Sequence, residues 1–140
     1  MLKPICLGTA IVLGIASEAN GIVMLASPEA WYFAVPGVTD TGPFNQHFVR
    51  DIGFIFLLLG VAFLAGAALP DLRVALWGLS AAWLTGHALF HFWEVAVGIC
   101  APSVLPRDFP AVTLPAILAM LLSLWAMADA RPARRAAATA

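Results

Sequence analysis

The chain has 140 residues, of which 62 % are hydrophobic and 11 % are charged. A water-soluble domain is about 45–50 % apolar and about 25 % charged, so this composition excludes a soluble globular domain, and it excludes a disordered chain, which needs the opposite bias. The formal net charge of −1 gives no basic surface for nucleic acid. The sequence therefore predicts a membrane-embedded protein whose first partner is the lipid bilayer.

Four stretches are apolar over the roughly 20 residues that a helix needs to cross a bilayer. In chain order they are residues 5–26, 46–69, 72–99 and 110–128. Pro70-Asp71 predicts a tight turn that makes the second and third spans an antiparallel hairpin. The expected fold class is thus all-α, a four-transmembrane-helix bundle that forms a single membrane-embedded domain over residues 1–140.

Lysine and arginine are unevenly divided between the two sides of such a bundle. One side holds Lys3, Arg73, Arg131, Arg134 and Arg135. The other side holds only Arg50 and Arg107. Because basic residues favour the cytoplasmic side, we expect both termini in the cytoplasm of a bacterium and a multi-pass protein of its inner (plasma) membrane.

A signal peptide is the alternative interpretation of the first span. Lys3, the apolar run and Ser17-Glu18-Ala19 loosely resemble a signal peptide with its cleavage site. A glutamate within that site and the apolar continuation through residues 21–25 favour an uncleaved span.

Ionisable residues within the predicted spans lie at one depth, in the outer half of the bilayer. Glu18 lies in the first span between Gly14 and Gly21, small residues that admit a neighbouring helix. The second span opens with His47, Arg50 and Asp51, and the third carries His87, His91 and Glu94 at i, i+4 and i+7, on one helix face. Since charged groups are costly in hydrocarbon and usually face a partner or a cavity, this shared depth predicts a polar site open toward the periplasm.

The carboxylates of this predicted site exceed its one arginine by two. Protonated carboxyls, protonated histidines or a bound divalent cation would neutralise this surplus. Two histidines one turn apart with a carboxylate are a frequent set of metal ligands in helices. We therefore expect a metal site with His87, His91 and Glu94 as core ligands and His47, Asp51 or Glu18 completing the shell. Imidazole with carboxylate suits zinc, iron, copper or manganese. The alternatives are a structural ion-pair network and a proton-coupled or small-ligand site, and the sequence leaves open whether the protein is an enzyme.

The loop of residues 27–45 carries aromatic residues that suit the membrane interface. It is either an interfacial anchor or a lid over the polar residues. Asn45, at its end, is placed to cap the second span.

The segment Thr41-Gly42-Pro43-Phe44-Asn45-Gln46-His47-Phe48-Val49-Arg50-Asp51-Ile52-Gly53 resembles a stretch found in a group of small bacterial four-helix membrane proteins. Members of that group carry a later His-rich helix, matched here by His87, His91 and Glu94. The resemblance implies the four-helix fold and the same polar residues, and it implies no activity.

Glu18 loosely resembles the carboxylate in the first span of the small multidrug resistance transporters, which are also short four-helix proteins. By analogy, the chain could be a small proton-coupled transporter that uses Glu18. A third hypothesis is a non-catalytic subunit of a larger membrane complex, or a homo-oligomer.

Overall fold

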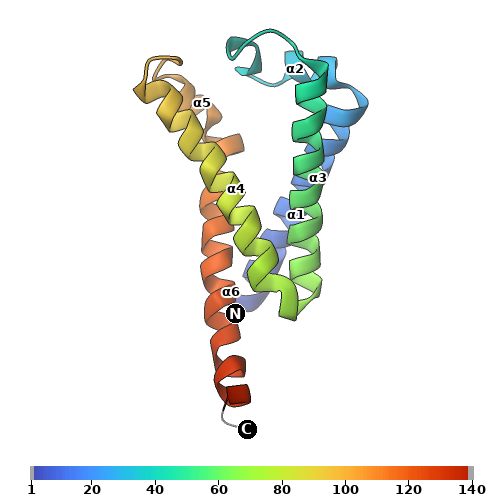
Figure 1. Ribbon diagram of the computed structural model, residues 1–140, viewed down its shortest axis with the longest axis vertical. Helices are drawn as coiled ribbons and strands as arrows, with labels where there is room; N and C mark the ends of the chain where they lie inside the picture. The colour runs from blue at the N-terminus through green and yellow to red at the C-terminus, as the bar shows by residue number, and fades with distance from the viewer. Residues whose placement is uncertain (1, 139–140) are drawn as a thin grey trace.

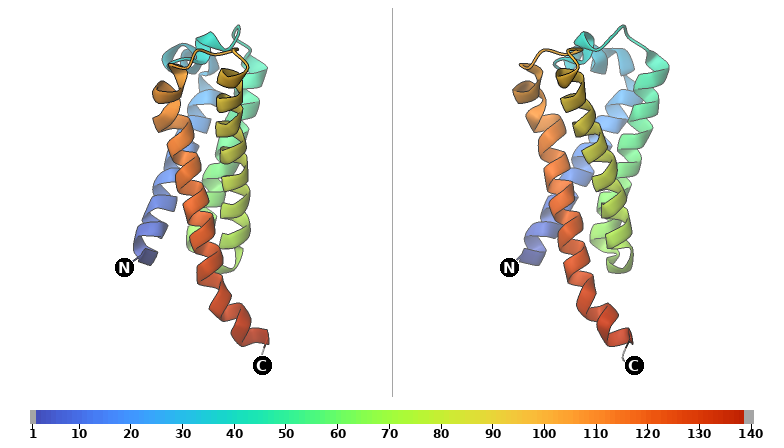
Figure 2. Two further views of the ribbon diagram at one scale, coloured as in Figure 1. Left: turned by 90° about the vertical axis from the view of Figure 1, so that its left-hand side faces the viewer. Right: turned by 60° about the vertical axis from the view of Figure 1, so that its left-hand side comes forward.

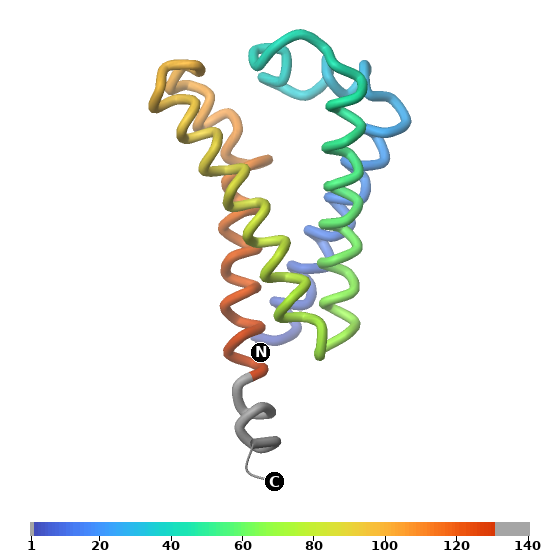
Figure 3. The backbone as a smooth tube through the Cα atoms, in the orientation of Figure 1, coloured from blue at the N-terminus to red at the C-terminus, as the bar shows by residue number. Residues whose placement is uncertain are grey.

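The computed structural model of the protein describes residues 2–138, with side chains up to residue 130. Regular structure in these residues is helical throughout, which confirms the predicted all-α class. The elements, traced in Figure 3, are α1 (Leu2–Ala26), α2 (Pro28–Ala34), the 3-10 helix η1 (Val38–Asp40), α3 (Gln46–Ala68), α4 (Pro70–Ala96), α5 (Val104–Asp108), the π-helical turn η2 (Phe109–Thr113) and α6 (Leu114–Ala138).

The long helices form two antiparallel pairs that together have the shape of a V (Figure 1). α1 packs along α3, and α4 packs along α6. The pairs meet where α1 begins and α3 turns into α4, and they diverge toward the end that holds α2, η1 and α5. We call the first the inner end and the second the outer end, after the predicted orientation.

A single residue, Leu69, separates α3 from α4. The sequence predicts the tight turn at Pro70-Asp71, but these residues are the first two of α4. Proline suits the first helical position because its missing N–H has no partner there, and an acidic residue in the first turn faces the positive end of the helix dipole. The hairpin of α3 and α4 is confirmed, with its turn one residue earlier.

Glycines spaced seven residues apart bring α1 and α3 into close contact. Gly14 and Gly21 on α1 face Gly60 and Gly53 on α3. A Cβ atom built on Gly21 would lie 2.7 Å from the Gly53 carbonyl oxygen, and one built on Gly60 would lie 2.5 Å from Cγ of Glu18. The expectation that small residues beside Glu18 admit a neighbouring helix is confirmed.

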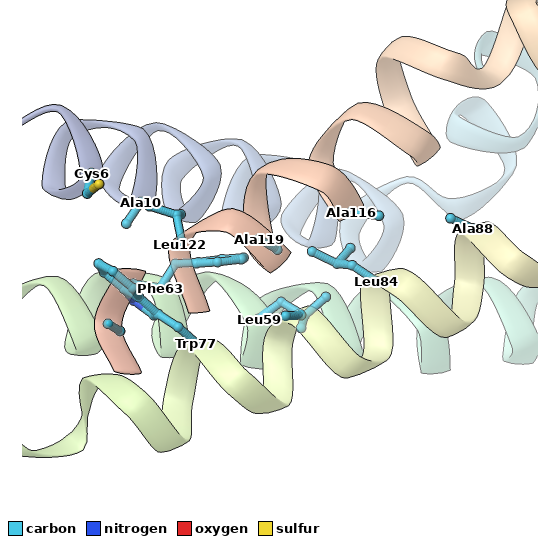
Figure 4. Packing of buried hydrophobic residues seen from close by; sticks show 12 residues of the cluster. Cys6, Ala10, Leu59, Phe63, Trp77, Leu84, Ala88, Ala116, Ala119 and Leu122 are labelled. Carbon is cyan, nitrogen blue, oxygen red and sulfur yellow. The ribbon is translucent and has the colours of Figure 1, made fainter. Parts of the chain in front are cut away.

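Buried apolar side chains from all four long helices join the two pairs toward the inner end. Trp77 of α4 and Phe63 of α3 are fully buried, and the Trp77 indole N–H donates to the Phe63 carbonyl at 3.1 Å. Figure 4 shows both rings in a cluster with Leu122 of α6. The same cluster continues outward between α4 and α6 as far as Ala88 and Ala116.

Three helical segments are long and apolar enough to cross a membrane, namely Leu2–Ala26, Gln46–Ala68 and Val104–Ala130. Large apolar side chains such as Leu58 and Leu79 are 70 % and 72 % exposed, which is compatible with lipid contact and a multi-pass membrane protein. α4 has 27 residues, but its histidines, tryptophans and charged residues make it less apolar. The count of four spans stays a prediction.

Candidate functional site

α4 places His87 and His91 one turn apart on one face, as their spacing predicts. The centres of the two imidazole rings are 4.9 Å apart, and the ring planes meet at 78°. His87 also stacks on the indole of Trp83, with 5.2 Å between ring centres and 14° between the planes. The two histidine rings are therefore in contact with each other, and the His87 ring also packs against the Trp83 indole.

The chain reverses after α4 and brings Asp108 against His91. Gly98 ends the helical region with a φ of +78°, which glycine adopts without steric cost, and the Ile99 N–H donates to the Glu94 carbonyl at 2.9 Å. α5 follows this reversal, and at its end Oδ2 of Asp108 lies 3.3 Å from Nδ1 of His91. Both side chains are largely buried, at 20 % exposure for His91 and 15 % for Asp108. We call His87, His91 and Asp108 the outer histidine cluster.

Arg107 connects the outer histidine cluster to the loop between α1 and α3. Its Nε lies 2.7 Å from Oδ1 of Asp108, and its Nη1 lies 2.8 Å from Oδ2 of Asp40 in η1. The guanidinium also occupies the space where a Cβ of Gly37 would stand, and Gly37 has a φ of +86°. Both views of Figure 2 show the loop that carries η1 and the loop that leads into α5 at the same, outer end, where the Arg107–Asp40 ion pair joins them.

His47 and Asp51 lie apart from the outer histidine cluster. They form an exposed pair in the first turns of α3, with 3.2 Å between His47 Nε2 and Asp51 Oδ2 and side-chain exposures of 87 % and 57 %. Because α3 and α4 diverge toward the outer end (Figure 1), this pair stands on the other side of the V. The structure does not bring these two predicted ligands to the histidines of α4.

Glu18 and Glu94 also occupy separate places. Glu18 is half-buried between α1 and α3, where its side chain lies against Gly60. Glu94 is half-buried on α4, one turn beyond His91. Within residues 2–130, whose side chains the structure describes, no three His, Cys, Asp or Glu residues lie close enough to hold one metal ion. The metal site stays a prediction.

Two arginines cap the C-terminal ends of long helices, Arg50 of α3 at the end of α1 and Arg73 of α4 at the end of α3. Arg50 Nε donates to the Leu25 carbonyl near the end of α1 at 3.2 Å; that Arg50 also balances charge or orients a carboxylate stays a prediction. Arg73 is buried, and it donates from Nε to the Gly66 carbonyl at 2.8 Å and from Nη2 to the Ala67 carbonyl at 3.2 Å. Both arginines satisfy carbonyls that lack a partner within their helix.

A pocket of about 430 Å³ opens beside His87 on the outer half of α4. It is lined by Ala82, Trp83, Gly86, His87 and Phe90. Trp83 also packs edge-on against Phe56 of α3, with ring centres 5.7 Å apart. One lining residue of this open depression therefore contacts α3, and the others belong to α4 as well. A small molecule in this pocket would meet one polar imidazole among aromatic and small apolar groups.

Sequence reasoning missed Asp40, Arg107 and Asp108. They lie in connections between spans, and 67 positions separate Asp40 from Arg107, so no helical spacing relates them. The signal that was present is charge of opposite sign in two loops predicted to lie on the same side of the membrane. Comparison of the chain with protein-family models, with curated proteins and with solved structures finds no match.

Proposed function

We propose that the chain crosses the membrane four times, with α4 as the third span in chain order and both termini in the cytoplasm. α3 and α6 run in the same direction, from the outer to the inner end (Figure 1), and each is long and apolar enough to cross. The chain between them must therefore return, and α4 is the helix that lies there, packed along both. Its lower apolarity fits a helix that turns Arg73, Trp77 and Ser80 inward.

The function we propose is binding of a divalent transition metal at the outer histidine cluster. His87 and His91 would supply two imidazoles, and Asp108 or Glu94 would supply the carboxylate. The observation that carries this proposal is the contact of 3.3 Å between His91 and a carboxylate from a separate helix, beside a second imidazole one turn away. Two imidazoles with one carboxylate form a ligand set that suits zinc, iron, copper or manganese.

The charges around the outer histidine cluster favour a cation. Asp108 and Glu94 lie next to His91 and one turn beyond it, and Arg107 joins Asp108 to the further carboxylate of Asp40. With neutral histidines the excess is negative, which a divalent ion would neutralise. For the ligands to meet at one point, the His87 ring must turn toward His91, and Asp108 must exchange part of its contact with Arg107 for the metal.

Metal content of the purified protein tests this function. The protein, carrying an affinity tag without histidines, is purified in detergent, incubated with each of the four metals, desalted and assayed by mass spectrometry. We expect roughly one metal per chain and its loss in the double variant His87→Ala with His91→Ala. Of Asp108→Asn and Glu94→Gln, the variant that removes the carboxylate ligand should lose the metal as well. His47→Ala, which removes the exposed histidine of α3, is the matched control and keeps the metal. Wild-type protein without metal, or a loss in His47→Ala as large as in the double variant, contradicts the proposal.

The position of Glu18 favours proton-coupled transport as a second candidate function. Its carboxyl group is half-buried against Gly60, between two helices that are long and apolar enough to span the membrane. A carboxyl in such a place can take up and release a proton as its surroundings change. This candidate predicts proton release on addition of a lipophilic cation such as tetraphenylphosphonium to detergent-solubilised protein.

The control for this candidate is Glu29, a glutamate on the exposed surface of α2. Glu18→Gln should abolish the proton release, and Glu29→Gln should leave it unchanged. If proton release persists in Glu18→Gln, the carboxyl group of Glu18 is not the group that carries the proton.

A further inference from the structure

Exposed aromatic rings lie toward one end of the molecule only. Within residues 2–130, whose side chains the structure describes, every exposed phenylalanine or tryptophan lies in the outer half of a long helix or in an outer connection. Phe54 lies about two turns into α3, and the others lie nearer the outer end. These others are Phe33, Phe48, Phe90, Phe92, Trp93 and Phe109. We call them the aromatic collar, and α2 and the ends of α3 and α4 that carry most of them lie at the outer end in Figure 1.

The aromatic rings of the inner half lie inside the molecule. Phe63 and Trp77 are fully buried, and Trp125 packs against Trp77 with 6.0 Å between the ring centres. The large apolar side chains exposed in that half are aliphatic or methionine, such as Leu79, and residues 131–140 contain no aromatic residue. Exposed aromatic and exposed aliphatic side chains are thus divided along the axis of the bundle.

Ionisable residues lie at the same level as the aromatic collar. His47 precedes Phe48, Glu94 follows Trp93, and Asp108 precedes Phe109. Ionisable groups are costly in hydrocarbon, whereas a band of exposed apolar rings is unfavourable in water and marks a contact with protein or membrane. A level that holds both kinds of group suits the boundary where lipid headgroups and water meet the upper acyl chains.

Trp93 shows this double character in one side chain. It is 51 % exposed, and its ring stacks on that of Phe90 with 5.5 Å between centres and 24° between planes. In the described part of the chain its indole N–H has no acceptor, whereas the indole N–H of Trp31 donates to Asn20. An apolar ring with a free N–H is what favours tryptophan at the membrane interface, where lipid or water supplies the acceptor.

We propose that the aromatic collar is the surface by which the protein contacts the headgroup region of the outer leaflet of a phospholipid bilayer. His91 is two positions from Trp93, and Asp108 adjoins Phe109, so the contact between His91 and Asp108 lies at the same boundary and outside the hydrocarbon interior. The proposal does not depend on metal binding. It rests on the proposed four-span arrangement only for the part of the collar that α4 carries.

Fluorescence quenching by lipids that carry a nitroxide at a chosen depth tests the collar. With Cys6 and Cys100 changed to alanine, each variant receives a bimane label at one new cysteine and is reconstituted into phosphatidylcholine vesicles. Phe48→Cys and Trp93→Cys each replace one collar ring, and Leu58→Cys and Leu79→Cys, at exposed positions nearer the inner end of the same helices, are the matched controls. A headgroup nitroxide should quench the collar labels most, and a nitroxide near the middle of the acyl chain should quench the controls most. The two labels on α3 should differ in depth by up to about 15 Å.

The pair of labels on α3 tests the collar without assuming that α4 crosses the membrane, because α3 is itself long and apolar enough to span. If α4 is not a span, the acyl-chain nitroxide quenches Leu58→Cys and not Leu79→Cys, and headgroup quenching at Phe48→Cys still supports the collar. Collar labels that the acyl-chain nitroxide quenches most, as it does the controls, overturn the proposal. Collar labels that neither lipid quenches also overturn it, because the rings then face water or a protein partner.

Discussion

At the scale of single residues, the surroundings of Arg73 differ most from what its position in the sequence suggests. Counted along the sequence, Arg73 is a positive charge on the cytoplasmic side. In the structure it is buried over Trp77 and Trp125, with its guanidinium 5.4 Å and 5.6 Å from their ring centres, and it reaches Asp129 of α6 at 3.6 Å. One side chain thus caps α3, binds α4 to α6 and places its charge among aromatic faces.

Replacement of Arg73 by methionine should destabilise the protein more than the same change at Arg50. Arg73 makes two charge-assisted hydrogen bonds to carbonyls while 4 % exposed, and each such bond contributes about 1.5–3 kcal/mol when its partner is left unpaired. Arg50 makes one such bond and is half-buried. Thermal unfolding in detergent should therefore show a larger fall in Tm for Arg73→Met. An equal fall in Tm for Arg73→Met and Arg50→Met would contradict the larger contribution of Arg73 to stability.

At the scale of elements, the α1–α3 pair depends on glycines at its crossing. Gly21 has a carbonyl oxygen of the opposite helix 2.7 Å from where its Cβ would lie, and Gly53 has Cβ of Met24 at 2.9 Å. Neither neighbour is the flexible end of a side chain. The two helices can relieve such a clash only by moving apart along the whole contact.

Alanine at Gly21 or Gly53 should therefore cost about 1–3 kcal/mol, the usual range for overpacking. Gly8 is the matched control, because it lies in α1 with no heavy atom within 4 Å of a built Cβ. Gly8→Ala should be neutral or slightly stabilising, since alanine favours a helix over glycine. Unfolding of the three variants in a denaturing detergent gives the comparison. If Gly21→Ala is as stable as Gly8→Ala, α1 and α3 do not pack as closely at Gly21 and Gly53 as the structure shows.

At the scale of the whole molecule, the positions of the long helices could be predicted from the sequence, and the way in which the two helix pairs pack together could not. Apolar runs and the helical period place the long helices, and Asn45 caps α3 as predicted, with its Oδ1 accepting the Phe48 N–H at 3.1 Å. The period also explains why His87 and His91 share a face. The V shape arises from the packing of one helix pair on the other, which no single-helix pattern encodes.

The candidate site was predictable only where its residues share a helix. Six residues at one depth were expected to converge, but depth fixes height along the bundle and leaves position around it free. His47 and Glu18 therefore lie at other places around the bundle. Asp108 reaches His91 through the reversal after Gly98, a tertiary contact that spacing along one helix cannot indicate.

The topology proposed for the whole molecule can be tested with three exposed positions in a background without native cysteines. Thr39 and Ala101 lie in the two outer connections, and Asp71 lies in the first turn of α4, at the inner end. If α4 crosses the membrane, an impermeant thiol reagent added to intact spheroplasts should label Thr39→Cys and Ala101→Cys. Asp71→Cys should react only after permeabilisation. If α4 stays on one side, Ala101→Cys and Asp71→Cys must behave alike, because only α4 separates them. That result would exclude the four-span arrangement and, with it, a histidine cluster that opens outward.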